Sequence, residues 1–142
     1  AVLANDEIMN VIQPGQHGST YGGNPLAAAV AMEAMKVVLD EKLADNAEKL
    51  GQLFRSEINK LIQDFSLFKS VRVKWLLNAI LINDTTDSET AWNFCVKMME
   101  NGLLAKPTHG NIIRFAPPLV MNEEQLHECI AVIRKTAEEF NK

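Results

Sequence analysis

Apolar residues recur along this chain in patterns that predict helices alternating with short strands. Residues 1–3 are a short apolar strand candidate. Residues 25–39 are apolar on nearly every side, which predicts a helix buried on several faces between larger bodies of protein. Residues 43–61 carry one apolar stripe and a charged outer face, typical of a helix that lies on a sheet. The stripe consists of Leu43, Ala47, Leu50, Phe54, Ile58 and Leu61.

The middle of the chain predicts a strand followed by a helix. Residues 71–82 alternate at first and are then apolar on both faces, which predicts one strand whose end is buried. Residues 84–88 form a polar turn. Thr86 and Glu89 have the spacing of a capping box at the start of the next helix, and Asn101-Gly102 has the residue types that end one.

Two shorter strands and a last helix complete the pattern. The strands are expected at residues 103–106 and 112–115, with a turn at 108–111 between them. The last helix is expected to begin at Asn122, with Gln125 three residues further on. The order helix, helix, strand, helix, strand, strand, helix predicts the α+β class, with a small, mostly antiparallel sheet covered by helices on one face.

Composition and charge narrow the class of protein. The 142 residues are 47% hydrophobic and 23% charged, which is ordinary for a soluble globular chain. A formal net charge of -4 does not suggest a nucleic-acid-binding surface. Cys95 and Cys129 lie in helical patterns among apolar residues and are interpreted as buried structural thiols. His17, His109 and His127 have no ligand-like spacing, so no metal site is predicted.

The segment at residues 17–26, His-Gly-Ser-Thr-Tyr-Gly-Gly-Asn-Pro-Leu, carries the strongest chemical signal. Ser19 and Thr20 place two adjacent hydroxyl donors in a glycine-rich loop. Asn24 suits an N-cap and Pro25 suits the first helical position. Such a loop beside a helix N-terminus is suited to hold a phosphate. The alternative is a glycine-rich turn that only begins a helix.

A second segment, residues 101–119, reads Asn-Gly-Leu-Leu-Ala-Lys-Pro-Thr-His-Gly-Asn-Ile-Ile-Arg-Phe-Ala-Pro-Pro-Leu. Together with the loop it resembles the ornithine aminotransferases, a group of class III aminotransferases that use pyridoxal 5'-phosphate. The resemblance extends over essentially the whole chain. It implies that Arg114 binds the α-carboxylate of glutamate or 2-oxoglutarate through the two-bond fork of its guanidinium. The alternative for Arg114 is a surface arginine at the end of a strand.

The resemblance also implies a fold, an assembly and a reaction. Residues 1–39 would end the large cofactor-binding domain of a fold type I enzyme, and residues 40–142 would form its small C-terminal domain. Ser19 and Thr20 would reach the cofactor phosphate of the neighbouring subunit in a homodimer. The δ-amino group of L-ornithine would pass to 2-oxoglutarate, giving glutamate semialdehyde and glutamate. The compartment implied is the mitochondrial matrix or the cytoplasm.

Two departures from the family pattern qualify this expectation. The family usually has glycines where this chain has Val73 and Trp75. The Schiff-base lysine of the family has no counterpart here, because it lies upstream of the matching region. The chain is therefore expected to be a C-terminal portion, without transaminase activity by itself. The alternative is a non-catalytic α+β module, derived from an aminotransferase, that binds a partner.

Overall fold

The computed structural model describes residues 3–140, and the chain divides into two compact units, Ala1–Glu41 and Lys42–Lys142. Two residues of the strand expected at 1–3 lie outside the described residues, and the third belongs to no strand. The assignment of residues 1–39 to a large cofactor-binding domain stays a prediction. No helix among residues 3–140 is long and apolar enough to cross a membrane.

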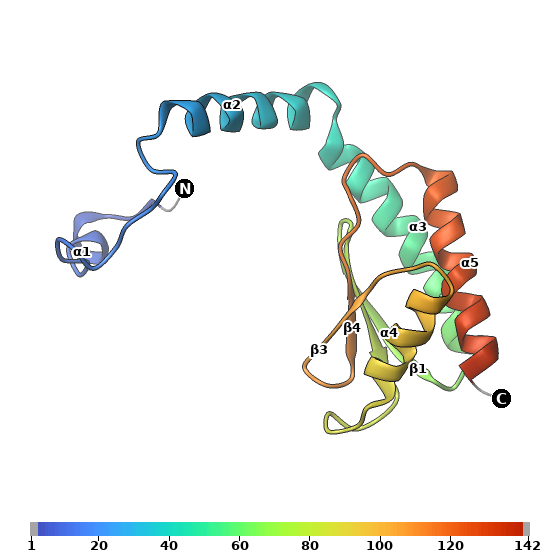
Figure 1. Cartoon of the computed structure of the whole chain (residues 1–142). Helices are drawn as coiled ribbons and strands as arrows, with labels where there is room; N and C mark the ends of the chain where they lie inside the picture. Colours follow the sequence, from blue (N-terminus) through green and yellow to red (C-terminus); the bar gives the residue numbers. More distant parts are fainter. Residues whose placement is uncertain (1–2, 141–142) are drawn as a thin grey trace. The chain divides into compact units, whose positions relative to one another are not determined.

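The first unit contains two helices, α1 (Asp6–Met9) and α2 (Pro25–Asp40) (Figure 1). The helix expected at 25–39 is thus confirmed, and so is its cap. No residue of α2 is buried among the described residues, and its burial between larger bodies of protein stays a prediction. Its large apolar side chains are exposed among the described residues. The largest of them are Leu26, Val30, Met32, Met35 and Leu39.

The second unit is a four-stranded antiparallel sheet with three helices on one face (Figure 1), which confirms the predicted α+β class. Its strand order is β1-β2-β4-β3. The helices bury apolar residues against this face of the sheet, and that burial is the main stabilising contribution. The elements are α3 (Leu43–Asp64), β1 (Phe68–Lys74), β2 (Leu77–Ile82), α4 (Thr90–Glu100), β3 (Lys106–Thr108), β4 (Ile112–Phe115) and α5 (Glu123–Phe140).

The predicted stripe of α3 is confirmed. All six apolar residues of the stripe are buried, and Gly51 is buried beside them. A Cβ atom at Gly51 would lie 1.7 Å from the backbone oxygen of Trp75, so glycine allows the chain at Trp75 to pass directly over the helix. This close approach joins α3 to the tip of the β1–β2 hairpin.

That hairpin corrects the expectation of one strand over residues 71–82. The chain reverses at Trp75 and Leu76, and Lys74 pairs with Leu77 in the antiparallel register. Trp75 has φ +52, in the left-handed region that favours glycine. It therefore takes the glycine-like backbone expected of the family residue at this position. The turn escaped prediction because it contains no Gly, Pro, Asn or Asp.

The N-terminus of α4 also differs from its prediction. The helix begins at Thr90 after Glu89, which makes no side-chain capping bond. Thr86 is not its cap, because the Asp84 carboxylate organises the preceding turn instead. Asp84 accepts hydrogen bonds from the Thr90 hydroxyl and from the backbone N–H of Thr85. These bonds, that of Thr90 first, hold the pKa of Asp84 below its usual range.

The other predicted boundaries agree more closely with the structure. Gly102, with φ +97, follows the end of α4. The predicted capping box is confirmed, since Gln125 N–H donates to Asn122 Oδ1 (2.9 Å) and Asn122 N–H donates to Gln125 Oε1 (3.0 Å). The third strand lies at Lys106–Thr108 rather than 103–106. Pro107 is tolerated there because β3 is an edge strand.

The hairpin turn generates a stability prediction. We expect Trp75→Gly to be more stable than Trp75→Ala by about 1 kcal/mol, because alanine keeps the left-handed strain that glycine relieves. Both variants lose the same contact, in which Lys74 Nζ lies 5.0 Å from the Trp75 ring centroid. Urea unfolding of both variants measures the difference. Equal stabilities would show that the left-handed backbone at this turn carries no strain.

Candidate functional site

The glycine-rich loop is organised by the Ser19 hydroxyl. Ser19 Oγ accepts hydrogen bonds from the backbone N–H groups of Tyr21 (3.2 Å) and Gly22 (3.0 Å). Because its lone pairs are occupied, the hydroxyl proton stays available to donate outward. A Cβ atom at Gly22 would lie 3.3 Å from the Ser19 Cβ atom, so glycine lets this turn close tightly. Thr20 lies beside it, exposed.

The helix that follows does not offer its first N–H groups to a ligand. Asn24 Oδ1 accepts from the backbone N–H of Leu26 (3.0 Å) and of Ala27 (3.2 Å). The predicted N-cap is therefore confirmed, but it occupies two of the donors that a phosphate at a helix N-terminus would use. An anion at this loop would depend on the hydroxyl protons of Ser19 and Thr20. Two adjacent hydroxyl donors, both exposed, fit a phosphate group chemically.

Arg114 lies in the middle of β4, in the second unit, and its side chain is exposed. Its neighbours Ile113 and Phe115 are buried among the helices, and the Phe115 and Phe54 rings lie 5.6 Å apart. Side chains alternate along a strand, so burial of these two directs Arg114 to the face that the helices leave open. Within residues 3–140 its guanidinium makes no ion pair.

The predicted site residues therefore fall in separate units, Ser19 and Thr20 in the first and Arg114 in the second. The sheet brings two other cations beside Arg114, which no motif of the sequence indicates. Lys106 is the cross-strand partner of Arg114, and Arg72 lies two strands away at the same level. Lys106 and Arg114 belong to one short hairpin, whereas Arg72 lies far before them in the sequence, so only the register of the strands reveals this arrangement.

One pocket on the helix-covered side of this unit, of about 260 Å³, is unsuited to a charged amino acid. It is lined mainly by apolar side chains, among them Phe54, Phe115, Leu126 and Ile133. No Lys, Arg, Asp or Glu lines it, and a charged group placed there would lose its hydration without gaining a partner. The open face of the sheet is the better candidate for binding a carboxylate.

The cysteines are not poised for nucleophilic chemistry. Burial raises the pKa of the Cys95 thiol to about 11, and burial also raises the pKa of Cys129. Both thiols therefore stay protonated near neutral pH, and both are free. Among the described residues no cluster of three or more His, Cys, Asp or Glu side chains is placed to hold a metal ion.

Sequence comparison places the chain among aminotransferases. Residues 1–137 match the family described as aminotransferase class III. The chain is 59% identical over 136 residues to the mitochondrial ornithine aminotransferase of Drosophila melanogaster, covering 96% of this chain and 30% of that protein. The mitochondrial ornithine aminotransferase of Rattus norvegicus is 51% identical over 140 residues, which cover 99% of this chain and 31% of that protein.

Solved structures agree. An acetylornithine aminotransferase from Elizabethkingia anophelis has a TM-score of 0.85 and 69% identity, over 96% of this chain and 36% of that one. The ornithine delta-aminotransferase of Plasmodium falciparum has a TM-score of 0.82 and 46% identity, over 97% of this chain and 35% of that one. The chain thus spans about a third of the length of these relatives. This chain belongs to the class III aminotransferase family, whose members depend on pyridoxal phosphate.

Proposed function

We propose that this chain is the C-terminal part of a pyridoxal-phosphate-dependent ornithine aminotransferase. The complete enzyme would transfer the δ-amino group of L-ornithine to 2-oxoglutarate, giving glutamate semialdehyde and glutamate. Identities of 46–59% to ornithine aminotransferases over nearly the whole chain support this proposal. The observation that carries it is Arg114, an exposed guanidinium without an ion partner in the described residues, held on the open face of the sheet.

Arg114 would bind the α-carboxylate of glutamate or 2-oxoglutarate. A guanidinium donates two parallel hydrogen bonds to a carboxylate and so fixes the orientation of the acid as well as its position. An amino-group transfer needs the reacting carbon held in one orientation. Ile113 and Phe115, buried on either side of Arg114 in the strand, anchor the backbone that presents the guanidinium.

Ser19 and Thr20 would hold the phosphate of the cofactor. When bound, pyridoxal phosphate carries the amino group between the two substrates and acts as the electron sink. The Ser19 hydroxyl is preoriented, since the N–H groups of Tyr21 and Gly22 fix its oxygen. We propose that these hydroxyls serve the neighbouring subunit of a homodimer. The exposed apolar face of α2 is consistent with a helix that is covered in the complete assembly.

Two other functions remain as candidates. The 69% identity to a solved acetylornithine aminotransferase favours N-acetylornithine as the amino donor. Val73 and Trp75, in place of family glycines, favour a non-catalytic partner-binding module; against this, Trp75 keeps a glycine-like backbone.

For the compartment we propose the mitochondrial matrix or the cytoplasm, since the relatives from Drosophila melanogaster and Rattus norvegicus are named mitochondrial.

Turnover of the two amino donors tests the proposal. We expect the full-length protein that contains this chain, loaded with pyridoxal phosphate, to form glutamate from 2-oxoglutarate with L-ornithine as donor. Its kcat/KM for L-ornithine should exceed that for N-acetyl-L-ornithine. A reversed preference would assign it to the acetylornithine enzymes, and no turnover with either donor would favour the non-catalytic module.

The carboxylate clamp predicts how Arg114→Lys behaves in the full-length enzyme. Lysine keeps the charge but cannot form the planar two-bond fork, so the half-reaction with 2-oxoglutarate should slow about 10-fold or more. The half-reaction with ornithine should be affected less. Rapid-mixing spectroscopy of the cofactor measures each half-reaction separately. Equal losses in both would contradict a clamp specific for the oxo acid.

The phosphate loop predicts weaker retention of the cofactor when both hydroxyls are removed. Each charge-assisted hydrogen bond contributes about 1.5–3 kcal/mol, so Ser19→Ala with Thr20→Ala should raise the Kd for pyridoxal phosphate at least about 10-fold. Loss of the cofactor's visible absorbance on dilution reports the release. Gln13→Ala, at an exposed position upstream of the loop, is the matched control. Unchanged retention in the double variant would mean that the loop only begins a helix.

A further inference from the structure

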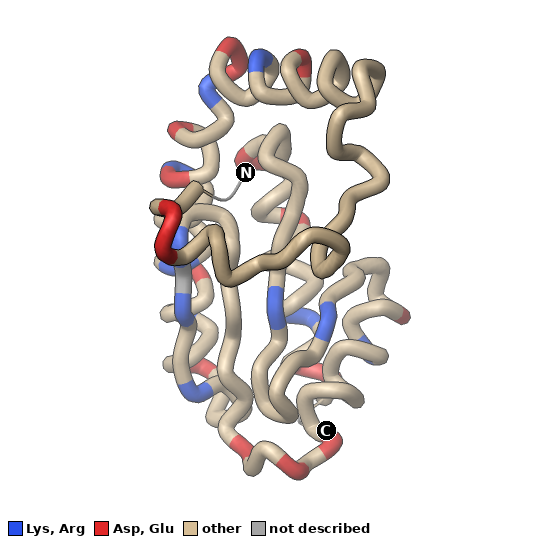
Figure 2. The backbone as a smooth tube through the Cα atoms, turned by 90° about the vertical axis from the view of Figure 1, so that its left-hand side faces the viewer, with Lys and Arg blue, Asp and Glu red and all other residues tan. Residues whose placement is uncertain are grey.

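Three cations lie in one row across the open face of the sheet. The register pairs Arg72 of β1 with Ala79 of β2, Ala79 with Arg114 of β4, and Arg114 with Lys106 of β3. The row therefore crosses all four strands and carries a positive charge on three of them. Figure 2 shows Lys and Arg segments on neighbouring strands of this sheet.

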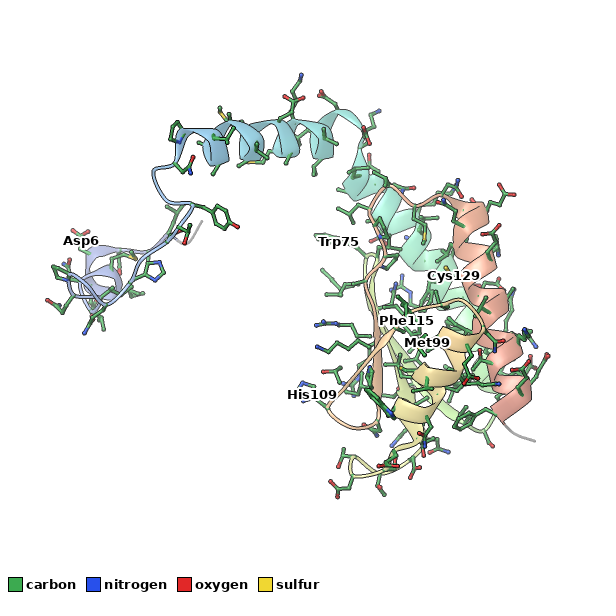
Figure 3. All side chains as sticks on the ribbon, in the orientation of Figure 1. Asp6, Trp75, Met99, His109, Phe115 and Cys129 are labelled. Atoms are coloured by element: carbon green, nitrogen blue, oxygen red, sulfur yellow. The ribbon has the colours of Figure 1, made fainter. Side chains whose placement is uncertain are left out.

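The spacing of strands sets the distances within the row. Directly opposed residues on neighbouring strands have Cα atoms about 4.5–5.5 Å apart, so Lys106 and Arg114 are adjacent. Arg72 is two strands from Arg114, about 10 Å away. Ala79 lies between these arginines with only a methyl group, which leaves space above the sheet for their long side chains. Figure 3 shows nitrogen-tipped side chains projecting from the strands on the side away from the helices.

No opposite charge neutralises the row from within the sheet. Positions on the same face, two residues along each strand, carry no acidic side chain: they are Ser70, Lys74, Leu77, Leu81, Ile112 and Thr108. Arg72, Lys106 and Arg114 are exposed. In the part of the chain that the structure describes, none of the three takes part in an ion pair.

A row of like charges is unfavourable unless an anion completes it. Directly opposed like charges on neighbouring strands destabilise the sheet. An anion bound over the row interacts favourably with all three groups, and the Coulomb energy grows in proportion to its charge. A dianion therefore gains more from the row than a monoanion of the same shape.

We propose that Lys106 and Arg72 extend the carboxylate site of Arg114 into a cationic row that selects dianionic 2-oxo acids over monoanionic ones. Arg114 holds the α-carboxylate, and Lys106 and Arg72 supply the positive potential that favours a second carboxylate on the same molecule. Both are specificity-determining residues, separate from the clamp itself. The inference rests on the proposed function for its reaction, but its binding claim is tested without turnover.

The test measures binding of two 2-oxo acids to the full-length protein by titration calorimetry. The ligands are 2-oxoglutarate, a dianion, and 2-oxohexanoate, a monoanion of similar length. Lys106→Gln should raise the Kd for 2-oxoglutarate about fourfold and the Kd for 2-oxohexanoate only about twofold, since the lost Coulomb energy is proportional to ligand charge. At 1 M salt the Debye length is about 3 Å, and the difference between the ligands should largely disappear.

Lys135→Gln is the matched control. It removes the same charge from an exposed position on α5, in the helical layer. It should leave both dissociation constants nearly unchanged, because α5 lies in the helical layer, on the face of the sheet opposite the row. Its ion pair with Glu139 is exposed and weak, so losing that pair should cost little stability. The proposed role of the row would be overturned if Lys106→Gln weakened the binding of both ligands equally, or if its effect were no larger than that of the control.

A folding defect in Lys106→Gln would be detected by its melting curve. In that case Arg72→Gln, at the other end of the row, takes its place, and it should likewise weaken binding of 2-oxoglutarate more than binding of 2-oxohexanoate. Turnover of ornithine by the wild-type protein is measured separately. If binding is charge-selective but there is no turnover, the proposed reaction is refuted and the proposed cationic row is supported. If there is turnover but binding is not charge-selective, the proposed reaction is supported and the cationic row is refuted.

Discussion

Burial of one face of the four-stranded sheet is the interaction on which the candidate site depends. The helices α3, α4 and α5 cover that face, and residues such as Ile80, Ile113 and Phe115 fill the space between. Because side chains alternate along a strand, burying these residues directs their neighbours to the opposite face. The position of Arg114 is therefore a consequence of hydrophobic packing on the far side of the sheet. A slip of one residue in β4 would bury the guanidinium and expose Phe115.

The close approach between Gly51 and Trp75 links the helical layer to the same sheet. The β1–β2 hairpin reverses over α3 at the one residue whose missing side chain leaves space for the Trp75 carbonyl. That contact restrains the hairpin and thereby the register between Arg72 and Ala79. Trp75 holds a left-handed backbone, φ +52, that glycine adopts more readily. Its ring stays exposed, so the core does not have to accommodate it.

The sequence predicted best those features that are set by local pattern. The α3 stripe and the capping box of Asn122 and Gln125 each lie within one element, and both are confirmed. The hairpin at Trp75 was missed because its turn contains none of the usual turn residues. The cap at Thr86 was wrong because the Asp84 carboxylate competes for the same turn.

The candidate site could be predicted from the sequence only in part, because local patterns do not show how distant strands pair. Arg114, Ser19 and Thr20 were identified through family motifs, each contained in one continuous segment. The row that joins Arg114 to Lys106 and Arg72 depends on the register of two hairpins and on the pairing of β2 with β4, which are distant in sequence. A single sequence does not show register, because sliding either strand by two residues keeps the same faces buried. The assignment of roles to these residues stays a prediction.

The central claim is that the open face of this sheet presents Arg114 to a substrate carboxylate. A crystal structure of the full-length protein with 2-oxoglutarate bound tests it most directly. We expect both oxygens of one carboxylate at about 2.7–2.9 Å from two guanidinium nitrogens of Arg114. Density for 2-oxoglutarate elsewhere, with Arg114 instead paired to a carboxylate of the protein, would contradict it.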